Sequence, residues 1–184
     1  MNIVGYKIGG QDNDTHMFRD DSSLRKCEGC GYRLDFSATN PQYCLNKCSD
    51  DISATYDGQT IVSRAFKDFC ERNEYQGIKF AVFENDPNHF HLVVLREVKF
   101  DAERRKTRFE NLCPQCGNYE SIVGAKPAYL LISEPLDSGF YRSDLLFASG
   151  NEKHPLTLIG NETKAKLEAA KLKGLEFSPA YGIE

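Results

Sequence analysis

The sequence predicts an α+β fold in which mixed or antiparallel sheets are combined with a few short helices. Short stretches alternate between apolar and polar residues, as half-buried strands do, and two longer stretches place apolar residues at helical spacing. Each helical stretch is followed by a glycine and another strand pattern. With 184 residues, of which 40% are hydrophobic, the chain can bury a core as one domain.

The first helix is expected soon after a cysteine-rich segment. A strand at Ile3–Ile8 opens the chain. Polar loops follow it, and residues 25–53 contain four of the seven cysteines of the sequence. Apolar residues at positions 65, 66, 69 and 70 share one helix face, and Ser63 is placed to cap that helix.

Two strands are expected after this helix. Gly77 ends the connection, Ile78–Phe83 alternates as a strand does, and Phe90–Leu95 forms the next strand. The polar residues 85–88 are expected to form the turn between them.

The C-terminal part repeats this pattern, with a strand ending at Ile159, a helix at Glu162–Lys171, then Gly174 and a strand. A shift of 97 residues aligns five pairs: Cys70 with Leu167, Tyr75 with Leu172, Gly77 with Gly174, Ile78 with Leu175, and Phe80 with Phe177. Duplication of one unit explains these matches, and so does convergence, because a short helix that returns to a strand favours glycine there. We therefore predict a single domain of residues 1–184, divisible into lobes 1–125 and 126–184, with one strand-helix-strand unit in each.

Two cysteine pairs share the pattern C-x-x-C-G, at Cys27–Gly31 and Cys113–Gly117. Two intervening residues let both sulfurs of a tight turn point at one metal ion, and the glycine lets the chain turn so that backbone N–H groups approach the thiolates. The sequence therefore predicts one zinc ion, bound in a zinc-ribbon-like site that braces the two units. The predicted ligands are Cys27, Cys30, Cys113 and Cys116. Four thiolates leave no open coordination position, so this zinc is expected to be structural.

Other roles for the cysteines remain open. Cys44 and Cys48 could replace the second pair and form a local zinc finger with the first, although their spacing is wider and no glycine follows. A redox role would require a helix after the motif, and neither segment shows one. Cys70 lies on the apolar helix face and is expected in the core.

No catalytic motif is recognisable, and we expect no enzyme activity. His89 and His91 lie two residues apart and point to one face of a strand, which is compatible with a metal-dependent hydrolase but also with exposed residues of no role. The basic run Arg104–Arg108 is diluted by neighbouring acids. Because the net charge is −4, nucleic acid is not the expected partner.

The location is expected to be cytoplasmic, without membrane contact. No apolar run approaches the length of about 20 residues that a membrane helix needs, and the first residues lack the apolar segment of a signal peptide. Paired cysteines in a reducing compartment are more often metal ligands than disulfides.

The two C-x-x-C-G segments, in a chain of about this size, resemble the bacterial double-CxxCG proteins. The tail, a helix followed by Gly174-Leu175-Glu176-Phe177-Ser178-Pro179, is similar to the ending of several immunity-protein families of bacterial polymorphic toxin and contact-dependent inhibition systems. The resemblance covers most of Lys26–Pro179, but residues 40–53, with the extra cysteine pair, depart from it.

This resemblance implies a small cytoplasmic protein that binds and neutralises one cognate toxin domain. Many such toxins are nucleases with basic clefts, which an acidic inhibitor would approach rapidly. The runner-up is a zinc-ribbon protein that binds nucleic acid through Arg104, Arg105, Lys106 and Arg108. The toxin-contact residues and the oligomeric state are not marked in the sequence, and acidic loop residues such as Asp12 and Asp14 are the only candidates.

Overall fold

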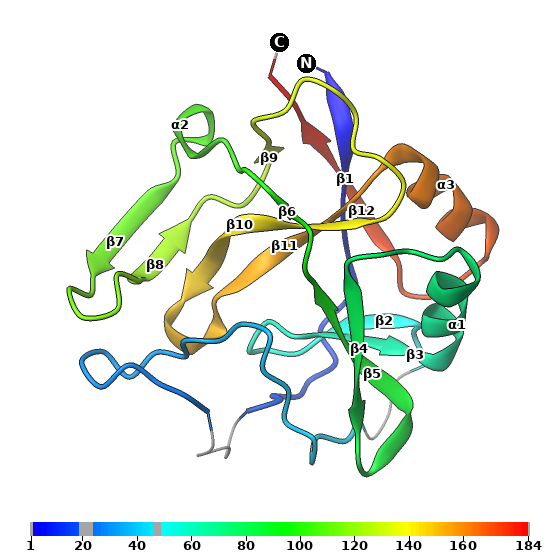
Figure 1. The fold of residues 1–184 in the computed structure, drawn as a ribbon, viewed down its shortest axis with the longest axis horizontal. Coiled ribbons are helices and arrows are strands. Elements are labelled where there is room, and N and C mark those ends of the chain that lie inside the picture. Colours follow the sequence, from blue (N-terminus) through cyan, green and yellow to red (C-terminus); the bar gives the residue numbers. More distant parts are fainter. Residues whose placement is uncertain (1, 19–23, 46–48, 184) are drawn as a thin grey trace.

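The structure is a computed structural model that describes residues 2–18, 24–45 and 49–183. These residues form two sheets and three short α-helices (Figure 1). The larger sheet has the strand order β7-β8-β10-β11-β1-β12-β9, and β6 pairs with β10 off this path. Its strands are β1 (Ile3–Gly9), β6 (Glu97–Val98), β7 (Arg108–Leu112), β8 (Tyr119–Val123), β9 (Ala128–Tyr129), β10 (Phe140–Ser149), β11 (His154–Ile159) and β12 (Glu176–Tyr181).

The smaller sheet has the order β2-β3-β5-β4, and all of its pairs are antiparallel. Its strands are β2 (Ile52–Ala54), β3 (Thr60–Ser63), β4 (Ile78–Phe83) and β5 (Asp86–Val94). The helices are α1 (Arg64–Arg72), α2 (Ala102–Arg105) and α3 (Asn161–Ala169), with a 3-10 turn η1 at Gly150–Glu152. The prediction of an α+β fold with mixed sheets and a few short helices is confirmed.

Helix α1 begins where the sequence predicts. The Ser63 hydroxyl accepts a hydrogen bond of 3.2 Å from the backbone N–H of Phe66, and the helix buries Phe66, Phe69 and Cys70. The predicted turn at residues 85–88 is wrong, because β5 already begins at Asp86 and only residues 84 and 85 form the turn. The Asp86 carboxylate holds this strand end in place by accepting the backbone N–H of Leu45 at 3.1 Å.

The segments β3-α1-β4 and β11-α3-β12 have the same strand arrangement. Each places its two strands on either side of an antiparallel central strand, β5 in the first and β1 in the second. With the 97-residue shift the registers also agree, since Val62 pairs with Phe90 and Ile159 pairs with Tyr6. Both helices start from extended residues with nearly equal backbone angles, φ −75° and ψ 168° at Ser63 and φ −76° and ψ 167° at Gly160.

Side-chain contacts repeat as well. Lys67 forms an ion pair with Glu71 and lies 5.5 Å from the Phe90 ring centre. At the equivalent positions Lys164 forms an ion pair with Glu168 and lies 5.0 Å from the Tyr6 ring centre.

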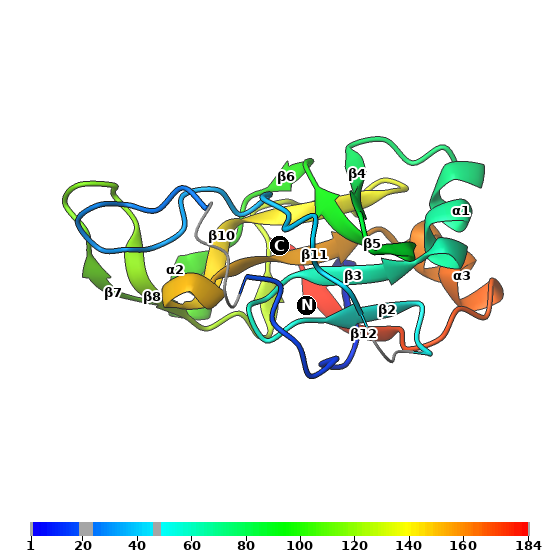
Figure 2. The same cartoon turned by 90° about the horizontal axis from the view of Figure 1, so that it is seen from below.

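The two segments pack against each other around one core. Figures 1 and 2 both place α1 and α3 at the same end of the molecule. Phe66 of α1, Phe140 of β10 and Leu167 of α3 are fully buried in this shared core. A second cluster lies around β8, β9 and β10, and a third joins Met17 and Tyr43 to the small sheet.

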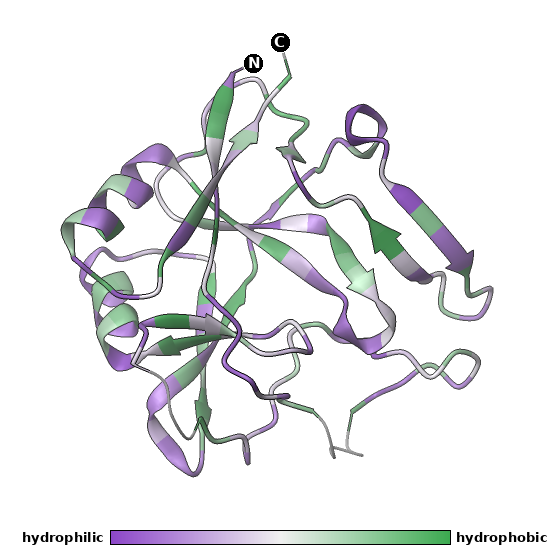
Figure 3. Cartoon of the chain, turned by 180° about the vertical axis from the view of Figure 1, so that it is seen from behind, coloured by the Kyte–Doolittle hydropathy of each residue, from purple (hydrophilic) through white to green (hydrophobic). Residues whose placement is uncertain are grey.

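Both α1 and α3 carry polar and apolar residues. Figure 3 shows α1 and α3 with both hydrophilic and hydrophobic stretches, as expected for helices that bury one face only. In the described part of the chain no helix is long and apolar enough to cross a bilayer.

Candidate metal centre

Each C-x-x-C-G segment forms the tip of a hairpin. The first lies between Lys26 and Arg33, which form an isolated antiparallel bridge, and the second joins β7 to β8 beyond the pair Leu112 and Tyr119. In Figures 1 and 2 the two tips lie at the end of the molecule opposite α1 and α3.

The two tips have the same backbone geometry. Gly31 N–H donates to the Cys27 carbonyl at 2.8 Å, and Gly117 N–H donates to the Cys113 carbonyl at 2.9 Å. The two glycines have φ of +73° and +71°, in the left-handed region that favours glycine. The glycines are therefore required by the shape of the turn that presents the thiols.

The structure brings the four predicted cysteines together. All four sulfurs lie within 4.8 Å of one another, with 3.9 Å between the Sγ atoms of Cys27 and Cys113 and 3.7 Å between those of Cys30 and Cys116. A tetrahedral zinc with bonds of about 2.3 Å requires sulfur separations of about 3.8 Å. The cluster therefore has the size of a closed metal site with four thiolate ligands.

Backbone groups and neighbouring thiols shift the pKa of two cysteines in opposite directions. The Asn118 N–H and hydrogen bonds from the other thiols lower the pKa of Cys116 to about 6. At Cys30 the N–H of Tyr32 favours the thiolate, but burial and hydrogen bonds to the neighbouring thiols raise the pKa to about 12. Crowded thiols thus resist full ionisation, and a divalent cation is the partner that removes this repulsion.

Lys153 adds a positive charge beside the cluster. Its side chain is buried, its ammonium donates to the Tyr119 carbonyl, and it lies 5.0 Å from the Tyr32 ring centre. Burial lowers the pKa of Lys153, whereas the thiols of Cys30 and Cys116 raise it. Four thiolates and one Zn²⁺ carry a net charge of about −2, which a nearby ammonium partly offsets. No pattern in the sequence pointed to Lys153.

The remaining cysteines lie elsewhere. The sulfur of Cys44 contacts the Asn85 carbonyl at 3.8 Å, and Cys48, the other residue of the local alternative, lies outside the described residues. Among the described residues the only group of potential metal ligands is the predicted one. Cys70 is a core residue as predicted, and burial raises the pKa of its thiol to about 12.

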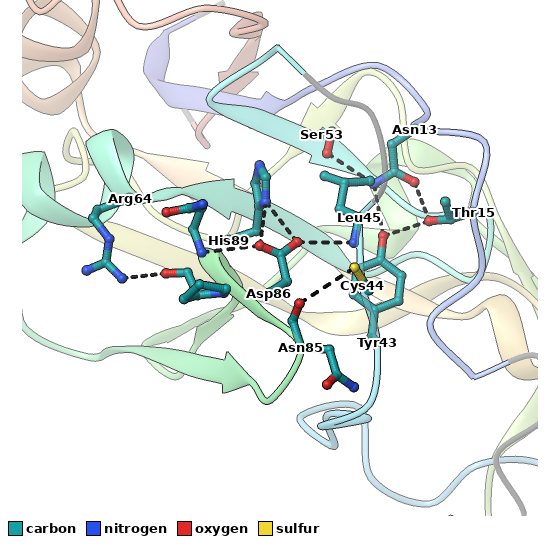
Figure 4. A network of polar contacts seen from close by, with 12 residues as sticks. Asn13, Thr15, Tyr43, Cys44, Leu45, Ser53, Arg64, Asn85, Asp86 and His89 are labelled. Atoms are coloured by element: carbon teal, nitrogen blue, oxygen red, sulfur yellow. Dashed lines mark hydrogen bonds and ion pairs between the residues drawn. The ribbon is translucent and has the colours of Figure 1, made fainter.

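The two predicted histidines have separate structural partners. His89 contacts the Asp86 carboxylate at 2.9 Å (Figure 4). His91 is buried and lies 2.7 Å from the Thr39 hydroxyl, and burial lowers its pKa to about 4. Neither belongs to a metal-ligand group within the described chain.

The basic run does not form a free cationic surface. Arg104 donates to the Gly182 carbonyl at 2.7 Å and lies over the Tyr129 ring, and Arg105 donates to the Lys126 carbonyl at 2.7 Å. These two guanidinium groups fasten α2 to neighbouring loops, which leaves Lys106 and Arg108 as the exposed members of the run.

No protein-family model matches this sequence, and a search of curated proteins finds no match. The functional proposals therefore rest on the residues of this chain.

Proposed function

We propose that the chain is an immunity protein that binds and neutralises a cognate bacterial toxin domain and has no enzyme activity of its own. The observation that carries this proposal is the pair of equivalent C-x-x-C-G turns, which meet in one four-cysteine cluster. The same motif pair is the specific part of the resemblance to double-CxxCG proteins.

The proposed metal is zinc, and its proposed role is structural. Four sulfurs surround the centre of the cluster, so a tetrahedral ion has no position left for water or substrate. The ion would link the loop that contains Cys27 and Cys30 to the β7–β8 hairpin, two parts of the chain that are separated in sequence by β2 to β6, α1 and α2.

The two strand-helix-strand segments are proposed to be related by duplication. The shared register, the equal angles at Ser63 and Gly160, and the repeated lysine contacts all support this. Convergence on a glycine explains only the position after each helix, and it gives no reason for matched lysine–glutamate pairs on the outer faces.

The proposed partner is a toxin domain with a basic surface, such as a nuclease. Residues 10–57 contain nine acidic and five basic residues, so they account for the whole net charge of −4. A localised acidic excess raises the association rate with a basic partner and competes with nucleic acid for it.

The test is co-expression with the toxin domain encoded by the neighbouring gene. We expect cells to survive and the two proteins to elute together from a sizing column. Cell death together with separate elution would overturn the immunity function. Salt-sensitive binding of nucleic acid by the isolated chain, with no toxin complex, would support the zinc-ribbon alternative instead.

A further inference from the structure

Two clefts lie at the seam between the sheets and share one wall, made by Gly58, Thr60, His154, Pro155 and Thr157. The first, which we call the His91 cleft, is also lined by His91 to Val94 of β5. The second, the Lys7 cleft, is also lined by Lys7 to Gly10 at and just beyond the end of β1. His91 pairs with Ile61 and Lys7 pairs with Leu158, so the two basic residues occupy equivalent positions of the two central strands.

The equivalent clefts differ greatly in volume. The His91 cleft has a volume of about 30 Å³ and the Lys7 cleft about 250 Å³. Gly9 and Gly10 stand where β5 has Val93 and Val94. A Cβ atom built on Gly9 would approach only the Lys7 ammonium, at 3.8 Å, so packing does not require a glycine there.

A loop of this chain contacts the residues of the His91 cleft. Phe36 lines it, and the Thr39 hydroxyl lies 2.7 Å from Nδ1 of His91. Lys7 has no partner equivalent to Thr39, since no described residue forms an ion pair with its ammonium. The charged group with the strongest electrostatic effect on Lys7 is the ammonium of Lys126. Burial and then Lys126 lower the pKa of Lys7, and Glu176 opposes them. An ammonium in such a place is stabilised by an added anion.

His154 supplies an acceptor in the shared wall. Its Nδ1 lies 2.8 Å from the Glu152 carbonyl, which can only accept, so Nδ1 carries the hydrogen. Burial lowers the pKa of His154, the hydrogen bond to Glu152 opposes this, and Lys7 and Arg33 lower the pKa further. The net shift is downward and favours the neutral ring, in which Nε2 accepts. A Cβ on Gly58 would lie 2.1 Å from Nδ1, so the glycine makes room for this ring.

We propose that the Lys7 cleft binds a small anion that also carries a hydroxyl group, of the class of hydroxycarboxylates and protonated phosphate. In this proposal the anionic oxygen accepts from the Lys7 ammonium and the ligand hydroxyl donates to His154 Nε2, while Thr60 and Thr157 line the same space. The exposed Asp12 at the rim disfavours polyanions, including nucleic acid. This site does not depend on the immunity function or on zinc.

The test is calorimetric titration of the full chain with sodium lactate and, separately, with sodium phosphate, at constant ionic strength maintained with sodium chloride. We expect at least one of the two to bind. Lys7→Met should weaken that binding at least tenfold, and Gly9→Val should weaken it similarly by filling the space as Val93 does. The matched control Lys79→Met removes the same charge from an exposed position of β4 and should leave binding unchanged.

Binding of lactate alone identifies a hydroxycarboxylate, and binding of phosphate alone identifies a phosphate. If Gly9→Val does not fold, Lys7→Met decides the question. The absence of binding by both compounds would overturn the proposal. Equal affinity of Lys7→Met and Lys79→Met for the anion would also overturn the proposal, because binding would then depend only on the overall charge of the protein.

Discussion

The paired-sheet core and the cysteine-linked periphery are held together in different ways. The core, around Phe66, Phe140 and Leu167, excludes water from apolar side chains that come from both halves of the chain. In the periphery, made of residues 24–36 and the β7–β8 hairpin, all five residues of β7 are exposed, and of the two strands only β8 buries residues, Ser121 and Ile122. A strand without a buried face gains little from the hydrophobic effect, so we expect β7 and the two cysteine turns to depend on the cysteine cluster for their shape.

Metal removal should separate the two regions most clearly. Structural zinc sites contribute about 10–16 kcal/mol of apparent binding free energy, and we expect a zinc ion bound here to order only the periphery. With a strong chelator we expect backbone amides of residues 24–36 and 108–118 to exchange with solvent far faster, while those of α1, β5 and β11 stay protected. Hydrogen exchange checks this, and simultaneous loss of protection in both regions would show that the core also depends on metal.

The core should be most sensitive to loss of a large buried ring. Phe66→Ala should lower the free energy of unfolding by about 3–5 kcal/mol, because Phe66 is fully buried between the two segments. The matched control is Phe109→Ala on β7, where the ring is 39% exposed and the loss should stay below about 1 kcal/mol. Urea unfolding measures both, and equal losses would remove the distinction between the regions.

Lys153→Met should weaken metal binding without altering the core. The ammonium offsets the negative charge of the thiolates, and loss of such an outer partner reduces metal affinity by about 10–100-fold. Competition with a coloured chelator gives the affinity. Unchanged affinity would mean that Lys153 serves only to bind the Tyr119 carbonyl.

The smallest expected effect concerns the two helix starts. Ser63→Ala removes the hydroxyl that caps α1 and should cost about 1 kcal/mol of unfolding free energy. Gly160 starts α3 with no side-chain cap, but a Cβ there would lie 2.4 Å from the carbonyl oxygens of Leu136 and Asp137. Gly160→Ala should therefore destabilise as well, by steric conflict. An unchanged free energy of unfolding in Gly160→Ala would contradict the close approach of the Leu136 and Asp137 carbonyl oxygens to this position.

The parts of the fold that could be predicted are those with a repeated apolar pattern. The strand β1 buries Val4 and Ile8, and the helix α1 buries Phe66, Phe69 and Cys70, so both show recurring apolar residues. β7 has no buried face and β9 has two residues, so neither produces a periodic signal. The polar composition of residues 85–88 predicts a turn there, but Asp86 belongs to β5. Its carboxylate contacts Leu45, which is distant in sequence, and His89, which is near, and composition reveals neither contact.

The four-cysteine cluster was predictable, because the C-x-x-C-G spacing is typical of a turn that presents two thiols to one ion. Lys153 and Lys7 were not, because the surroundings that make them unusual come from chain segments far away in sequence: Tyr119 and Tyr32 at Lys153, and Lys126 at Lys7. A single lysine in a polar segment has no pattern to distinguish it from a solvated one.

The most direct measurement of the central claim is the zinc content of three purified proteins by atomic absorption: the native chain, Cys113→Ser and Cys44→Ser. The Cys113 sulfur lies 3.9 Å from that of Cys27 within the cluster, whereas Cys44 belongs to another part of the fold. We predict one zinc ion per chain in the native protein and in Cys44→Ser, and loss of zinc in Cys113→Ser. Full zinc retention in Cys113→Ser, or its loss in Cys44→Ser, would contradict the account.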